Sequence, residues 1–87
     1  MSVTLPEING NQLIKLLKKD GWIEAGRRNH GIAFRKYFPD EKRTRITIIS
    51  THNDTLPKGT LSAILGPKQT NLGKDGLQKL INEYGLK

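Results

Sequence analysis

The sequence predicts an α+β domain, in which a three-stranded antiparallel sheet carries helices on one face and a further helix follows at the C-terminus. Three observations support this fold class. Apolar residues recur at helical spacing near both ends of the chain, and a middle segment rich in β-branched residues has the pattern of strands. The connections between these strands are short enough for hairpins. With 87 residues and no cysteine, the chain is predicted to form one domain, 1–87, without disulfides.

The first helix is indicated by leucines at i, i+3 and i+4 spacing, namely Leu13, Leu16 and Leu17. Either Asn9 or Asn11 can cap its start, and Asn9 with Gln12 has the spacing of a capping box. Gly21 is placed to end the helix, because glycine readily adopts the left-handed conformation that follows a helix.

Three strands are predicted next, over residues 22–25, 32–38 and 45–50. A glycine-bounded break over residues 26–31 separates the first two, and a turn over residues 39–42 separates the last two. In the second strand Phe34 falls on one face and Tyr37 on the other. We therefore assign Phe34 and Trp22 to the core and leave Tyr37 exposed.

Two helices complete the prediction. Pro57 can occupy the first turn of a helix that ends before Gly66 and Pro67. The apolar spacing of the last segment predicts a helix over residues 73–84. The core of the domain then spans about residues 9–65, and residues 66–87 form a C-terminal extension.

The charge is concentrated. The chain carries a net charge of +7, and residues 27–45 contain seven basic side chains against two acidic ones. This clustering favours a nucleic acid or an acidic protein as partner. No segment has the roughly 20 apolar residues that span a membrane, and the N-terminus lacks the pattern of a signal peptide. We therefore expect a cytoplasmic protein without a membrane partner.

His30 lies within this basic segment, next to Arg27 and Arg28. RNA is cleaved when its 2′-hydroxyl attacks the adjacent phosphate, a reaction that needs a base, an acid and cations. Imidazole titrates near neutral pH and can serve as either the base or the acid. We assign His30 as the general base, with the general acid as the alternative role. By residue type alone it could also be a turn histidine without chemistry.

The order of motifs resembles the HicA family of bacterial toxins, also called YcfA-like. An amphipathic helix ends in Lys-Asp-Gly-Trp at 19–22, and Gly-x-x-x-His-Gly follows at 26–31. A later strand ends in Ile-Ser-Thr-His at 49–52, before the segment 56–65, Leu-Pro-Lys-Gly-Thr-Leu-Ser-Ala-Ile-Leu. The resemblance covers about residues 9–65.

The resemblance implies a fold like that of double-stranded-RNA-binding domains, with the order α-β-β-β-α. It further implies an endoribonuclease that cleaves messenger RNA and is neutralised by a HicB-type antitoxin. We expect this activity to need no metal or other cofactor. The catalytic histidine of the family corresponds to His30. Asn29 stands where the family usually has a small hydroxyl residue.

The candidate RNA-binding residues are basic or aromatic: Arg27, Arg28, Arg35, Lys36, Tyr37, Arg43 and Arg45. His52 is a secondary catalytic candidate, although a role in its own loop is favoured. The segment 58–60 is expected to cap the second helix rather than grip phosphate. The alternative function is a small basic module that binds RNA or an acidic protein without catalysis.

Overall fold

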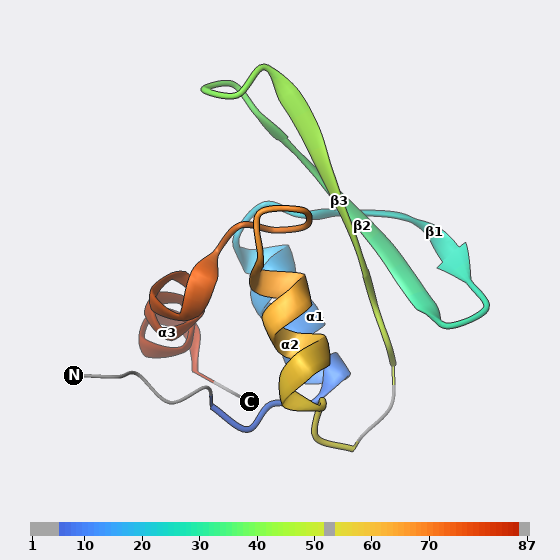
Figure 1. Ribbon diagram of the computed structural model, residues 1–87, viewed down its shortest axis with the longest axis vertical. Coiled ribbons are helices and arrows are strands. Elements are labelled where there is room, and N and C mark those ends of the chain that lie inside the picture. The colour runs from blue at the N-terminus through green and yellow to red at the C-terminus, as the bar shows by residue number, and fades with distance from the viewer. Residues whose placement is uncertain (1–5, 52–53, 86–87) are drawn as a thin grey trace.

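The computed structural model describes residues 6–51 and 54–85. It confirms the predicted fold class: one helix, three strands, and two further helices (Figure 1). The elements are α1 (Gly10–Lys19), β1 (Ile23–Arg28), β2 (Gly31–Phe38), β3 (Arg43–Ile49), α2 (Lys58–Leu65) and α3 (Gly73–Tyr84). None of the described helices is long and apolar enough to cross a membrane.

Helix α1 begins and ends as predicted. Asn9, rather than Asn11, is the N-cap: its side chain accepts a hydrogen bond from the backbone of Gln12 at 2.8 Å, and the Gln12 side chain accepts one from the backbone of Asn9 at 3.0 Å. At the other end, Gly21 has a φ of +95°, and the Trp22 amide donates to the Leu17 carbonyl. These bonds satisfy backbone groups that the helix itself leaves without partners.

The three strands form one antiparallel sheet in the order β1-β2-β3. Strand β1 is longer than predicted and shifted, because it starts at Ile23 and extends through Arg28. The predicted break over residues 26–31 is wrong: the irregularity is a bulge between Glu24 and Gly26, and pairing then continues. Gly26 accommodates the bulge with a φ of +123°. Strand β3 likewise starts two residues early, at Arg43.

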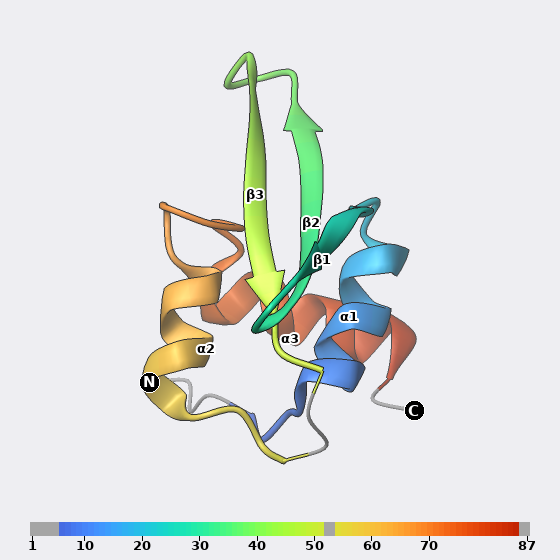
Figure 2. The ribbon, with the colours of Figure 1, turned by 90° about the vertical axis from the view of Figure 1, so that its right-hand side faces the viewer.

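All three helices lie on one side of the sheet, and the β2–β3 hairpin extends past them (Figures 1 and 2). Between sheet and helices lies a single apolar core, in which Phe34 and Leu13 are fully buried. Trp22 is 3 % exposed and packs edge-on against Phe38, with ring centroids 5.9 Å apart. The assignment of Trp22 and Phe34 to the core is therefore confirmed.

The C-terminal extension is an integral part of this core. Leu77 and Leu80 of α3 are buried in the same cluster as Phe34. Helix α3 has the predicted bounds, and α2 ends before Gly66 as predicted. Helix α2 starts at Lys58, so Pro57 precedes it rather than lying in its first turn. No side chain caps α2, so the predicted capping role of residues 58–60 is wrong.

Candidate functional site

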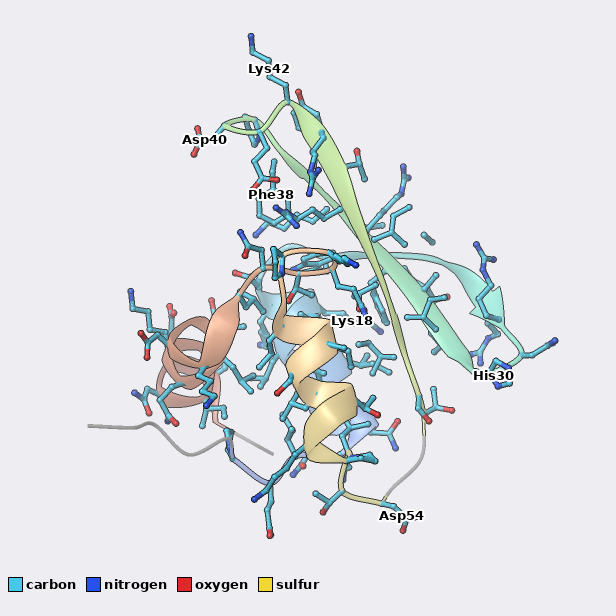
Figure 3. All side chains as sticks on the ribbon, in the orientation of Figure 1. Lys18, His30, Phe38, Asp40, Lys42 and Asp54 are labelled. Atoms are coloured by element: carbon cyan, nitrogen blue, oxygen red, sulfur yellow. The ribbon has the colours of Figure 1, made fainter. Side chains whose placement is uncertain are left out.

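The fold divides the predicted basic segment between two ends of the sheet. His30 lies in the β1–β2 turn, whereas Lys42 lies in the β2–β3 turn at the opposite end (Figure 3). Arg27 and Arg28 remain with His30, because β1 extends up to the turn. Only this end of the segment combines an imidazole with cations.

The β1–β2 turn is held tightly against the end of β3. Asn29 and His30 are the two turn residues, and Arg28 pairs with Gly31. Gly31 has a φ of +153°, and a Cβ atom on it would lie 2.1 Å from the carbonyl oxygen of Ile49. A side chain does not fit at that distance. Glycine at this position therefore allows the start of β2 to lie against the end of β3. The turn is thereby held close to the residues that follow β3.

A cleft of about 520 Å³ opens at this end of the sheet. The residues that line it include the His30 imidazole, the two arginines of β1 and three hydroxyl side chains: Arg27, Arg28, His30, Ser50, Thr51 and Thr60. These side chains are exposed to solvent, except that of Ser50, which is partly buried. The hydroxyls come from the end of β3 and from the first turn of α2, far from His30 in the sequence. The cleft thus combines a group that transfers protons, two cations and hydrogen-bonding groups in one open space.

A comparison with protein families assigns the chain to a family. A family model described as the HicA toxin of bacterial toxin–antitoxin systems matches residues 10–72, more than half of the chain. The chain belongs to the HicA toxin family. The resemblance of the sequence motifs is thereby confirmed, and the family implies an antitoxin partner. Searches of curated proteins and of solved structures find no match.

The region matched to HicA toxins includes every residue that lines the cleft, and it ends just before α3. The sequence analysis missed all three hydroxyl residues of the cleft, Ser50, Thr51 and Thr60. Of these, Thr60 is the one for which the sequence held a signal. It belongs to the segment 56–65 that carried the resemblance to HicA toxins, and its side chain was assigned to helix capping. Since it caps nothing and lines the cleft, its place in the family motif was the signal that could have indicated a role there.

Arg45 of this HicA toxin lies away from the cleft and is 7 % exposed, not a free surface cation. Its guanidinium forms two bonds to the Glu41 carboxylate, at 2.8 and 3.0 Å. It also donates to the backbone carbonyls of Pro67 and Gln69. Arg45 therefore fastens β3 to the loop between α2 and α3, and its bonding groups are directed into the protein.

We predict that Arg45→Met lowers the free energy of unfolding at pH 7 by about 2 kcal/mol, because charged hydrogen bonds are lost and two carbonyls lose a donor. The Arg45 hydrogen bond lowers the pKa of Glu41 below its ordinary value of 4.5. A lowered folded-state pKa stabilises the protein above the ordinary value, and this contribution is lost as the pH falls through the folded-state pKa. The difference between the wild type and the variant should therefore narrow below about pH 4.5. Urea unfolding at pH 7 and pH 3 measures both effects.

Arg43→Met is the matched control for that substitution. Arg43 contacts the same carboxylate at 3.3 Å, but its side chain is 57 % exposed. Exposed ion pairs contribute about 0–1 kcal/mol. If both variants lost the same free energy of unfolding, the buried contacts of Arg45 with the loop would contribute nothing to stability.

Lys36 is also engaged within the fold. Its ammonium donates to the backbone carbonyl of Asp20 at 2.6 Å and lies 3.3 Å from the Asp20 carboxylate. This position, at the C-terminal end of α1, is where a helix favours a cation. Lys36 thus faces the helices and contributes to the cap of α1.

Arg35 and Tyr37 lie on the opposite, open face of the sheet. Both side chains are exposed, and neither lines the cleft. Among the predicted RNA-binding residues, only Arg27 and Arg28 share the cleft with His30. His52, the secondary catalytic candidate, lies outside the described residues. Within the described part of the chain, no group of three His, Cys, Asp or Glu side chains could hold a metal ion.

Proposed function

We propose that this toxin is an endoribonuclease that cleaves messenger RNA, with His30 as the catalytic residue. The observation that carries the proposal is the cleft, in which the imidazole shares an open space with Arg27 and Arg28. The proposal places the RNA backbone in this cleft. The two guanidiniums bind the phosphate, and the imidazole faces the adjacent ribose.

In the proposed reaction His30 takes the proton from the ribose 2′-hydroxyl. The 2′-oxygen attacks the neighbouring phosphorus, the bond to the 5′-oxygen breaks, and a 2′,3′-cyclic phosphate forms. Negative charge builds up on the phosphoryl oxygens during this step. Fixed cations that are already in place, such as Arg27 and Arg28, stabilise that charge. The leaving 5′-oxygen takes a proton from water. In the alternative role, His30 is the acid that donates this proton.

The hydroxyls of Thr51 and Thr60 extend the proposed site. They can hydrogen-bond to phosphate oxygens on either side of the cleaved bond. With His30 and the two arginines as the reacting groups, the proposed activity needs no metal and no other cofactor. A HicB-type antitoxin neutralises it in the cytoplasm, where messenger RNA is translated.

The proposal is tested with the purified toxin, free of its antitoxin, and two oligonucleotides of identical sequence. One is RNA and the other is DNA, and both reactions contain EDTA. We expect cleavage of the RNA alone, with products that end in a 2′,3′-cyclic phosphate, because the DNA lacks the attacking hydroxyl. Mass spectrometry of the products identifies that end group.

Two outcomes would contradict the proposal. Cleavage of the DNA would show that the 2′-hydroxyl is not the nucleophile. Binding of RNA without any cleavage would favour the alternative of a non-catalytic basic module, and fluorescence anisotropy with labelled RNA measures that binding.

A further inference from the structure

The face of the sheet opposite the helices is open and strongly apolar. The register places Ile23, Arg35 and Ile46 in one row across the three strands, and it places Ile48 beside Ala33 on the same face. We call this surface the outer face and define it by Ile23, Arg28, Arg35, Tyr37, Ile46 and Ile48. Arg28 and Ile48 also line the cleft, so the two surfaces meet there. In Figure 2 the strands lie in front of α3, so the outer face is the side of the sheet that faces away from that helix.

The outer face exposes large apolar side chains to solvent. Ile23 is 59 % exposed, Tyr37 58 %, Ile46 55 % and Ile48 44 %. Among the described residues, the other large hydrophobic side chain with comparable exposure is Tyr84, on α3. A contiguous apolar patch of this kind marks an interaction surface, since single exposed hydrophobic residues are common but clusters are not.

Two arginines give this apolar surface a positive charge. Arg35 lies between Ile23 and Ile46 in the register. The Arg28 guanidinium folds over Gly26, 3.4 Å from where a Cβ atom would stand. Neither arginine has a carboxylate within 4.0 Å among the described residues. A complementary surface therefore carries carboxylates among apolar side chains, with one of them opposite Arg35.

Charge disfavours a second copy as the occupant, because two outer faces would bring like-charged arginines together in chains that each carry +7. RNA fits poorly as well, because isoleucine offers no hydrogen bond to a phosphate or a ribose. Isoleucine, tyrosine and arginine on one surface are typical of the core of a protein–protein interface. Membership of the toxin family supplies such a protein partner, the antitoxin.

We propose that the outer face is the docking surface for the antitoxin, which presents apolar side chains interspersed with carboxylates. Ile23, Ile46 and Tyr37 provide the apolar contacts, and Arg35 pairs with a carboxylate of the antitoxin. This inference rests on family membership and on the antitoxin partner included in the proposed function. It does not depend on RNA cleavage.

The test uses the purified toxin and its purified cognate antitoxin. The double variant I23T/I46T removes the two most exposed isoleucines of the outer face and keeps β-branched residues, which suit strands. Isothermal titration should show an affinity for the antitoxin about 100-fold weaker than that of the wild type. Y84A is the matched control, since it removes an exposed apolar side chain from α3, and its affinity should equal that of the wild type.

Charge is tested by R35E, which should weaken binding at least about 10-fold and reduce its dependence on salt concentration. Amide NMR spectra of all variants establish that the fold is retained. RNA cleavage by I23T/I46T should match that of the wild type, so failure of the nuclease proposal leaves this test intact.

Three outcomes would overturn the proposal. The first is unchanged antitoxin affinity in the folded I23T/I46T variant. The second is loss of RNA affinity in that variant while antitoxin affinity is retained, which would make the outer face an RNA surface. The third is a wild-type dimer in sedimentation that dissociates in the variant, which would make a second copy the occupant.

Discussion

Alanine in place of His30 should lower the rate of RNA cleavage about 10²–10⁴-fold, the usual contribution of a general acid or base. The expected loss is in the chemical step, because Arg27 and Arg28 remain in the cleft to bind the phosphates. Single-turnover cleavage of labelled RNA measures the chemical step. Fluorescence anisotropy should give nearly the same RNA affinity for the variant and the wild type.

Asn29→Ala is the matched control, because Asn29 lines the same cleft from the same turn. It should retain most of the activity, since its side chain transfers no proton. A folded His30→Ala variant that cleaves at the wild-type rate would remove His30 from the mechanism.

A sulfur-substituted substrate distinguishes the two roles of His30. RNA with sulfur in place of the leaving 5′-oxygen needs little help from an acid, because a thiolate leaves readily. If His30 is the general base, as proposed, His30→Ala should be as defective on this substrate as on ordinary RNA. Recovery of the rate on the sulfur substrate would instead assign His30 as the general acid.

Alanine at Gly10 should lower the free energy of unfolding by about 3 kcal/mol or more, beyond the usual cost of an overpacked site. Gly10 is the first residue of α1, and a Cβ atom there would stand 1.5 Å from the carbonyl oxygen of Ser50. The position of a Cβ atom is fixed by the backbone, and the oxygen that it meets is a backbone atom, so no side-chain rotation relieves the contact. Helix α1 would have to move away from the end of β3. Thermal unfolding should show a Tm roughly 12 °C lower, or more.

Gly59→Ala is the matched control, since it makes the same substitution near the start of a helix. Its expected effect on the free energy of unfolding has the opposite sign. Nothing lies within 4 Å of a Cβ atom at Gly59. Alanine should raise the free energy of unfolding there by roughly 0.5–1 kcal/mol, since glycine loses more conformational entropy on folding. A Gly10→Ala variant as stable as the wild type would show that α1 is not packed against the end of β3 as described.

The sequence predicted those parts of the fold that depend on neighbouring residues. The capping box of α1 joins residues three positions apart, and the apolar spacing of α3 gave its bounds. The extent of β1 was missed because Gly26 was interpreted as a break. A bulge accommodates it instead, and a bulge depends on the pairing with β2.

The candidate site shows the same division. His30 with its two arginines was predictable because the three residues are close in sequence. The inward direction of Arg45 was not, since its carbonyl partners Pro67 and Gln69 lie 22 and 24 residues away. The presence of Thr60 in the cleft likewise depends on how α2 packs beside the sheet.

The contribution of α3 to the core has a consequence for the synthesis of the toxin. The three strands and the cleft residues all precede α3 in the chain, but Leu77 and Leu80 complete the cluster beneath them. During translation the nascent chain therefore presents the sheet before the helix that buries its inner apolar face has been made. Until α3 has been made, the nascent chain lacks the part of the apolar core that Leu77 and Leu80 supply.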